Sequence, residues 1–387
     1  MPREKVQRLA LVALVVVAVA FVGSRLLHAG RHVAGHVTEH VADSGHHDRA
    51  TFEAEMAAVE AEMAALEAEI DAEVEGAVGG AISARAAGRD EVLFEQSFPV
   101  QPGDRLAVAL SSEDLVVETG AGAASVTVLG EGRDAREAFP RRRFSATYGG
   151  GTLRVETNPE RNGFRLGGER ASYTVVVRVP ERMAAELRLA SGDVRLGDLQ
   201  GDLHLETASG DASLGRVRDA AAVRVTTASG DVHAALLDGA EVAVQTASGD
   251  VQVDRLAART ASVQTASGDV AVGAAGADRF EAHTASGDVA VERLDAGAVV
   301  ASTASGDVAL RLDGAAPVEA STGSGDVGLA LPRAGFDVSL SGPAIEIDGA
   351  LDFQGQRGRR SAEGRLGGGG PRLAVSTGGG EIRLTAR

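Results

Sequence analysis

The tripeptide Ser-Gly-Asp occurs eight times between residues 191 and 326, at successive spacings of 18, 20, 19, 19, 19, 19 and 19 residues. A unit of about 19 residues is too short to bury a core alone, so repeats of this length stack on their neighbours. In one unit, EVAVQTASGDVQVDRL (241–256), apolar β-branched residues alternate with polar ones on both sides of the tripeptide. This period of two, broken by glycine, predicts strand, turn and strand. The repeat therefore predicts an all-β fold, a parallel β-solenoid (β-helix) with coils of about 19 residues.

Alignment of the units on Ser-Gly-Asp places apolar residues in three columns, which predict the buried side of the coils. The columns are Val223, Val242, Ala261, Phe280, Val299 and Val318; Val225, Val244, Val263, Ala282, Ala301 and Ala320; and Val232, Val251, Val270, Val289, Val308 and Val327. Positions between the columns are mostly polar and predict a solvent-facing surface, including Thr226, Gln245, Gln264, His283, Ser302 and Ser321.

Changes in composition predict the organisation of the rest of the chain. We expect a cytoplasmic start with a signal-anchor or signal peptide (1–27), a His-rich linker (28–50), an acidic amphipathic helix (51–76) and a linker (77–90). An N-terminal β cap with early coils (91–180), the regular solenoid (181–330) and C-terminal coils with a cap (331–387) follow, the last with a mobile Gly- and Arg-rich loop at 354–371. The solenoid is therefore expected to follow a membrane segment and an α-helix.

Residues 9–23 are apolar and follow Arg3, Lys5 and Arg8. A run this short suits a signal peptide better than a transmembrane helix of about 20 residues, although extension through residue 27 would allow an uncleaved anchor. The basic start places the following residues beyond the cytoplasmic membrane. We expect a single N-terminal pass through the cytoplasmic membrane, with the solenoid on the periplasmic or extracellular side, or secretion if this segment is cleaved.

Residues 51–75 hold nine acidic residues and no Lys or Arg. Apolar residues spaced three and four apart predict a coiled-coil-like helix, with Met56, Val59, Met63, Leu66 and Ile70 at the seam. A homodimer would oppose Glu to Glu at a cost of a few tenths of a kcal/mol per contact. A basic partner helix and a solitary spacer helix are both compatible with this pattern.

Four histidines spaced by four residues precede this helix, at His28, His32, His36 and His40. On a helix they would share one face, where imidazoles can bind Zn²⁺, Cu²⁺ or Ni²⁺. Gly30 and Gly35 weaken such a helix. A polar linker is therefore the favoured interpretation, with metal binding as the alternative.

The repeated aspartates are the sharpest chemical feature of the coils. Carboxylates about 4.8 Å apart repel by about 0.9 kcal/mol in water, so something must offset this repulsion. We expect them to accept N–H groups of the turns and Ser hydroxyls of adjacent coils. The structural turn residues are Ser209, Gly210, Asp211, Ser229, Gly230, Asp231, Ser248, Gly249, Asp250, Ser267, Gly268, Asp269, Ser286, Gly287, Asp288, Ser305, Gly306 and Asp307. Calcium between coils is the alternative, with ligands Asp231, Asp250, Asp269, Asp288 and Asp307.

No catalytic or cofactor-binding residue is assigned. His204, His233 and His283 occupy different columns, and aromatic platforms for sugars are scarce. No cofactor is expected, apart from the calcium alternative. The formal net charge of −17 argues against a nucleic-acid partner.

Three runs carry a resemblance to a known family, namely YTVVVRVPERMAAELRLASGDVRL (173–196), LETASGDASL (205–214) and VQTASGDVAV (263–272). Over about residues 92–385 the chain resembles the bacterial "putative adhesin" family with Ser-Gly-Asp repeats, a domain of unknown function. The resemblance implies a β-helix associated with the cell envelope and implies no particular activity.

These patterns favour a non-enzymatic, membrane-tethered β-solenoid that serves as an adhesin-like binding or scaffold module in the bacterial cell envelope, with a protein or glycan partner. Two alternatives stay open. One is a β-helical enzyme that acts on polysaccharides, and the other is an envelope stress or assembly component that works through oligomerisation.

Overall fold

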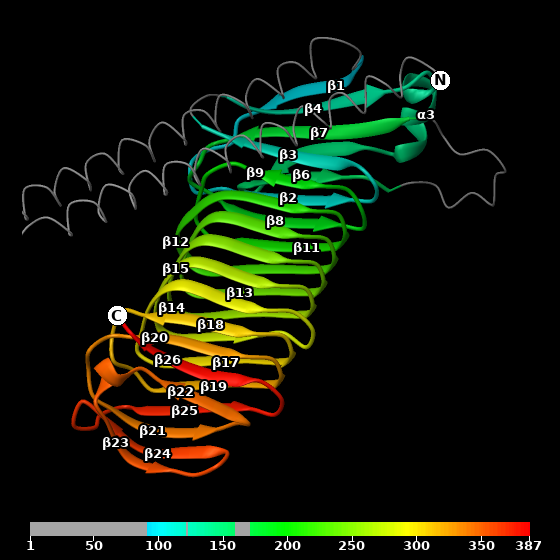
Figure 1. Cartoon of the computed structure of the whole chain (residues 1–387). Helices are drawn as coiled ribbons and strands as arrows, with labels where there is room; N and C mark the ends of the chain where they lie inside the picture. Colours follow the sequence, from blue (N-terminus) through cyan, green and yellow to red (C-terminus); the bar gives the residue numbers. More distant parts are fainter. Residues whose placement is uncertain (1–90, 121–122, 159–170) are drawn as a thin grey trace, which may run out of the picture. The chain divides into compact units, whose positions relative to one another are not determined.

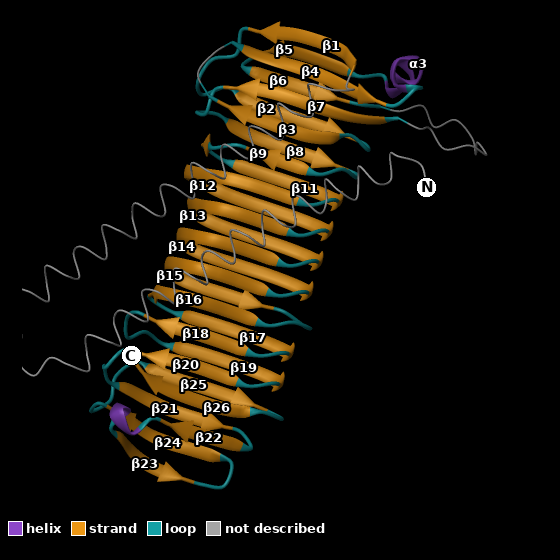
Figure 2. Cartoon of the chain, turned by 45° about the horizontal axis from the view of Figure 1, so that its top comes forward, coloured by secondary structure: helices purple, strands orange, loops and turns teal. Residues whose placement is uncertain are grey.

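The computed structural model describes residues 91–120, 123–158 and 171–387, which form a continuous stack of β-coils (Figures 1 and 2). Residues 87–387 make up one compact unit with a single continuous hydrophobic core. Within the described ranges, no helix is both long and apolar enough to cross a membrane. The expected membrane segment at 9–23, the histidines at 28–40 and the acidic helix at 51–76 lie outside the described residues.

Each regular coil consists of a strand before Ser-Gly-Asp, a corner at Ser-Gly-Asp, and a strand after it. We call the outer surfaces of the two strand sets the pre-corner face and the post-corner face. The strands of these coils are β8 (Ala184–Leu189), β9 (Val194–Leu196), β10 (Leu199–Gln200), β11 (Leu203–Ser209), β12 (Ala212–Ser229), β13 (Val232–Ser248), β14 (Val251–Ser267), β15 (Val270–His283), β16 (Val289–Ala296), β17 (Val299–Ser305), β18 (Val308–Leu312), β19 (Val318–Ser324) and β20 (Val327–Leu331). Strands β12 to β15 run through several sides of a coil without a break.

Parallel pairing joins equivalent positions of successive coils. Val225 pairs with Val244, Val244 with Val263, and Val263 with Ala282. All residues of the three predicted apolar columns are buried, each with at most 2% of its surface exposed. The predicted all-β solenoid and its core are therefore confirmed, and each fully buried Val or Leu contributes roughly 1.5–3 kcal/mol.

A third side of each coil adds an inward column that the two-strand pattern does not reveal. It consists of Leu199, Val217, Leu237, Leu256, Ala275, Leu294 and Leu312. The coil between Ser209 and Ser229 is one residue longer than the usual 19, and its extra residue also lies on this side. The extra residue of the 20-residue coil forms a bulge between Val217 and Ala220, where Asp219 has φ of +54°. The corners on either side consequently stay in register, with Ser209 paired to Ser229 and Ser229 to Ser248.

The N-terminal end is built out of sequence order. Its strands are β1 (Glu91–Phe98), β2 (Arg105–Leu110), β3 (Asp114–Thr119), β4 (Ala124–Glu131), β5 (Ser145–Gly149), β6 (Thr152–Glu156) and β7 (Ser172–Val179), with α3 (Ala135–Ala138) and η1 (Phe139–Arg142) beside them. The coil of β2 and β3 lies between β8–β9 on one side and β6–β7 on the other. Antiparallel strands β5, β4 and β1 then cover β6 and β7. The change from parallel to antiparallel pairing ends the stack, because the regular coil pattern cannot continue past it.

The C-terminal end repeats this arrangement. Its elements are β21 (Phe336–Ser341), β22 (Ala344–Ile347), η2 (Gly349–Leu351), β23 (Phe353–Arg357), β24 (Ser361–Leu366), β25 (Arg372–Thr377) and β26 (Glu381–Ala386). The last coil along the chain, β25–β26, inserts between β19–β20 and β21–β22. Antiparallel strands β24 and β23 follow β21 at the end of the stack, as Figure 1 shows.

The expected mobile loop at 354–371 is wrong for most of its length. Residues 353–366 form the β23–β24 hairpin, and only 367–371 connect it to β25. The glycines that suggested a loop serve the strand pairing. Gly355 and Gly364 lie directly opposite each other, and a Cβ built on either would lie within 2.3 Å of the other strand's backbone. Glycine at both positions lets the two strands approach closely.

Candidate functional site

The corners carry a continuous line of carboxylates along one edge of the solenoid, which we call the Asp ladder. The N–H of Asp250 donates to Oδ1 of Asp231 on the preceding coil (2.9 Å), and the N–H of Asp269 donates to Oδ1 of Asp250 (2.8 Å). Nine such bonds, between 2.7 and 3.0 Å, join the described residues from Asp114 to Glu381. Each carboxylate thus caps the corner of the next coil.

The need for this cap follows from the backbone bonds at the corner. The N–H of Gly249 donates to the carbonyl of Ser267 on the next coil (3.0 Å), and the N–H of Val251 donates to the carbonyl of Asp269 (2.8 Å). The N–H of Asp269 points in the opposite direction, back to the preceding coil, where the carboxylate of Asp250 accepts it. Without a side-chain acceptor, this N–H would interrupt the pairing between coils.

Glycine is required at the centre of the corner for two reasons. Gly268 has φ of +137°, a conformation that side chains with a Cβ rarely adopt. A Cβ at this position would also lie 2.2 Å from the carbonyl oxygen of Gly249 on the preceding coil. The conformation and the close contact recur at the central glycine of each regular corner from Gly192 to Gly325.

A buried threonine lies two residues before the serine of each corner from Ser209 to Ser324. The hydroxyl of Thr284 donates to the carbonyl of Gly268 on the preceding coil (3.1 Å), and Thr303 does the same to Gly287 (3.0 Å). Thr207 and Thr227 instead donate to the carbonyl of the serine in their own corner (both 3.2 Å). The predicted turn residues did not include this threonine column, although the recurring Thr-Ala-Ser-Gly-Asp was a signal for it.

The corner changes at both ends of the Asp ladder. At the C-terminal end, Glu381 is followed in space by the corner of β21 and β22, which contains Pro343 and is two residues shorter. In that corner Ala344 takes the register position of the ladder aspartates, and the Glu381 carboxylate pairs with Arg383 (3.0 Å). At the other end Glu113 stands in the glycine position and is buried. Its Oε2 accepts the N–H groups of Ser111 (2.9 Å) and Ser112 (3.0 Å).

The predicted Ser-to-Asp contact is not found. In the regular coils that the structure describes, the Ser hydroxyls of the motif make no hydrogen bond to the carboxylates, because the serines lie exposed on the outer side of the corner. The calcium alternative at Asp231, Asp250, Asp269, Asp288 and Asp307 stays a prediction. Over the described ranges, no three His, Asp or Glu side chains gather as a metal-binding group.

The three histidines of the solenoid stay apart. His204 contacts Glu206 (3.0 Å) on the pre-corner face, while His283 contacts Ser302 (2.7 Å) on the same face four coils away. His233 lies on the post-corner face, with Nε2 3.6 Å from Oδ1 of Asp254. The Asp254 carboxylate raises the pKa of His233, against the lowering caused by partial burial.

The pre-corner face presents an outward polar column in register. It contains Thr226, Gln245, Gln264, His283, Ser302, Ser321 and Ser376, each paired with the next in parallel strands. The corresponding outward column of the post-corner face consists of Ser213, His233, Gln252, Ala271, Ala290, Ala309 and Gly328. The two faces therefore differ in chemistry, with hydrogen-bonding groups sustained over more coils on the pre-corner face.

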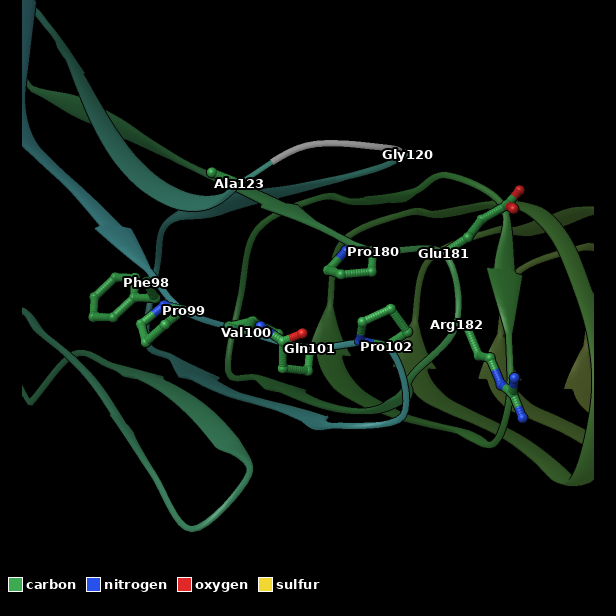
Figure 3. Close-up of a pocket in the computed structure, with 10 residues that line it drawn as sticks. All are labelled: Phe98, Pro99, Val100, Gln101, Pro102, Gly120, Ala123, Pro180, Glu181 and Arg182. Carbon is green, nitrogen blue, oxygen red and sulfur yellow. The ribbon is translucent and has the colours of Figure 1, made fainter.

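A cleft of about 590 Å³ opens beside the N-terminal cap, where Phe98 to Pro102 pass Pro180 to Arg182 (Figure 3). Glu181 and Arg182 point in different directions (Figure 3), and Glu181 forms an ion pair with Arg218 (3.4 Å). None of the residues that sequence patterns singled out as candidate ligands lines this cleft. In the sequence, the cleft is marked only by three prolines near the ends of strands, Pro99, Pro102 and Pro180.

Comparison with known proteins places the chain in a family. The profile of the Toastrack DUF4097 family matches residues 104–334 and again residues 237–385. No curated protein gives a significant match.

Among solved structures, a Parabacteroides distasonis protein named "putative lipid binding protein" shares 14% identity, with a TM-score of 0.36 over 77% of this chain and 97% of its own. A "putative adhesin" from Bacteroides fragilis shares 12% identity, with a TM-score of 0.33 over 76% and 97%. Another from Parabacteroides merdae shares 11%, with a TM-score of 0.34 over 77% and 97%. Likeness at this level assigns no ligand to this chain.

Replacement of one rung tests the cap. Asp269→Ala removes the acceptor for the N–H of Asp288, so we expect a loss of about 1 kcal/mol in the free energy of unfolding. Asp269→Asn keeps an acceptor oxygen and removes a charge, so its stability should stay close to that of the parent. Urea unfolding of residues 87–387 measures both, with Asp278→Ala, outside the ladder, as the control. If Asp269→Asn lowers the free energy of unfolding as much as Asp269→Ala does, the corner requires the negative charge and not merely an acceptor oxygen.

The pair of His233 and Asp254 predicts a pH dependence. Because the folded protein has the higher His233 pKa, the pair stabilises it fully below the unfolded value of about 6.5, and this contribution is lost as pH rises through the folded pKa. Both side chains are about half exposed, so the contribution is a few tenths of a kcal/mol. In an NMR titration, Asp254→Asn should lower the His233 pKa while Asp278→Asn leaves it unchanged. An equal pKa in all three proteins would contradict the assignment.

Proposed function

Because this chain belongs to the Toastrack DUF4097 family, we propose that it is a non-enzymatic, adhesin-like binding or scaffold module of the bacterial cell envelope. The single observation that carries the proposal is the in-register polar column of the pre-corner face, from Thr226 to Ser376. This column offers hydrogen-bonding side chains at a constant spacing of about 4.8 Å. An extended partner with regularly repeated polar groups, a peptide strand or a glycan chain, fits such a surface.

The hydrogen bonds at the corners favour the pre-corner face over the Asp ladder as the binding surface. One oxygen of each carboxylate from Asp114 to Asp326 is already engaged by the next coil. The side chains of Gln245 and Ser321 lie in the outward column, whereas the Ser302 hydroxyl also contacts His283 of the preceding coil (2.7 Å). A partner can therefore use Gln245 and Ser321 without loosening the stack.

The separation of the histidines supports a non-enzymatic role. General acid–base chemistry requires groups within hydrogen-bond reach of one substrate, whereas His204 and His283 stand four coils apart and His233 lies on the other face. The polysaccharide-acting alternative has no comparable observation in its favour.

Attachment to the membrane is a separate part of the proposal. The apolar run at 9–23 would anchor the chain, and the acidic segment at 51–75 would act as a spacer helix or as a site for a basic partner helix. The solenoid would then stand on the periplasmic or extracellular side.

A photo-crosslinking residue tests the binding face. Placed at position 264 in the full chain in cells, it should yield crosslinks to an envelope protein or glycan, whereas the same residue at position 252, on the post-corner face, should yield few. Replacing Gln245, Ser302 and Ser321 by Ala should reduce the crosslinks at 264 by at least about tenfold, because each lost hydrogen bond is worth about 1 kcal/mol. Equal crosslinking at 264 and 252, or release of soluble sugars from cell-wall glycan by the purified protein, would contradict the proposal.

Deletion of residues 1–27 tests the tether. The full chain should remain with the membrane after extraction at alkaline pH, and the shortened chain should not, because it lacks the apolar segment. A full chain that is found only in the soluble fraction would argue for cleavage and secretion.

A further inference from the structure

The charge of the solenoid is strongly uneven along the sequence. Residues 181–331 contain 23 Asp and Glu against 11 Arg and no Lys, a balance of −12. The C-terminal coils and cap, residues 332–387, contain 8 Arg against 6 Asp and Glu, a balance of +2. An acidic body therefore ends in a basic tip.

The positive charge of this tip is concentrated in the β23–β24 hairpin. Between Phe353 and Leu366 there are four Arg and one Glu. The loop closes with a hydrogen bond from the N–H of Gly358 to the carbonyl of Ser361 (2.7 Å), which leaves Arg359 and Arg360 at the turn. Every residue from Gln354 to Ser361 is exposed.

Few carboxylates neutralise these guanidinium groups. Arg357 lies over the ring of Phe353, 5.1 Å from its centroid, and Arg360 donates to the carbonyl of Gly378 (3.3 Å). Within the described ranges, neither of these arginines nor Arg359 has a carboxylate partner within 4 Å, whereas Arg365 pairs with Asp337 (3.5 Å). By contrast, Arg142 at the opposite end of the stack is engaged by the buried Glu113 (3.5 Å) and by Ser112 (2.6 Å).

The position of the hairpin determines what it can reach. Strand β23 pairs with β24, β24 with β21, and β21 with β25, so β24 lies two strand steps and β23 three, about 10 and 14 Å, beyond the coil that holds the last rung of the Asp ladder. Among the arginines of this described hairpin, only the side chain of Arg360 reaches back to that coil, at the Gly378 carbonyl. The Debye length at physiological ionic strength is about 8 Å. An anionic surface that meets the tip is consequently screened from the acidic coils, whereas the same surface along the side of the solenoid would be repelled.

We propose that the β23–β24 hairpin recognises phosphate groups and docks the solenoid end-on onto an anionic lipid bilayer through Arg357, Arg359 and Arg360. The planar guanidinium group presents paired donors that match phosphate oxygens. Three exposed arginines near an anionic membrane surface strengthen binding by about 100-fold. This docking depends neither on the pre-corner face nor on the N-terminal tether.

Vesicle flotation of residues 87–387, a compact unit with its own core, tests the proposal without the apolar N-terminal segment. The protein should float with phosphatidylcholine vesicles that contain about 30% phosphatidylglycerol and not with phosphatidylcholine alone, and about 0.5 M NaCl should abolish the binding. The variant R357Q/R359Q/R360Q should lose at least about tenfold in affinity for the anionic vesicles. The matched variant R259Q/R293Q/R311Q, which removes three exposed arginines from the regular coils, should bind as the parent does.

Two further arms keep the test decisive. R359Q/R360Q leaves the contact of Arg357 with Phe353 intact, so a loss of binding with an unchanged thermal midpoint attributes the effect to phosphate contacts and not to unfolding. Soluble polyphosphate should compete with the vesicles. Binding to polyphosphate without binding to anionic vesicles would overturn the assignment to a bilayer, and equal flotation of the parent and R357Q/R359Q/R360Q would overturn the role of the hairpin. Neither result bears on crosslinking at position 264, so this inference and the proposed function can fail separately.

Discussion

The hydrogen bond from the N–H of one corner aspartate to the carboxylate of the aspartate before it is the interaction on which the described solenoid depends. Parallel pairing accounts for the strands, but the chain must turn sharply between them, and there the N–H of Asp269 points back to the preceding coil. Glycine permits the turn, threonine caps the glycine carbonyl, and aspartate caps this N–H. Because the aspartate carboxylate caps the next coil and the threonine hydroxyl caps the preceding one, these residues are useful only when the motif is repeated.

This use of the carboxylates limits where function can lie. An Asp ladder bonded from coil to coil is first a structural device, and its charge makes the edge and the neighbouring coils acidic. The two binding surfaces that we propose lie away from the ladder carboxylates, on the pre-corner face and on the basic hairpin at the C-terminal tip. The first offers hydrogen-bonding side chains in register, and the second offers guanidinium groups on a hairpin whose strands lie about 10 and 14 Å beyond the coil of the last rung.

Exposed strand edges are covered in a similar way at both ends of the stack. A coil distant in sequence inserts beside the regular coils, and antiparallel strands then cover it. Along the corners, the ladder ends where the shorter corner of β21 and β22 places Ala344 opposite Glu381, and it begins beside Glu113, a buried carboxylate in the glycine position. These ends protect the stack from continued parallel addition.

The spacing of Ser-Gly-Asp, with alternating Val and Ala around it, was enough to predict the parallel solenoid, the three buried columns and the role of glycine, because these follow from local period and backbone freedom. The capping of the corners, the order of the terminal coils and the C-terminal hairpin depend on contacts between residues that are distant in sequence. The partner of the Asp269 N–H lies 19 residues away, β25 inserts between β19 and β21 after a detour along the chain, and residues 354–371 are mainly a hairpin because β21 offers β24 an edge. A period shows which residues are equivalent, but only the folded chain shows which groups meet, since pairing across coils depends on backbone direction and not on composition.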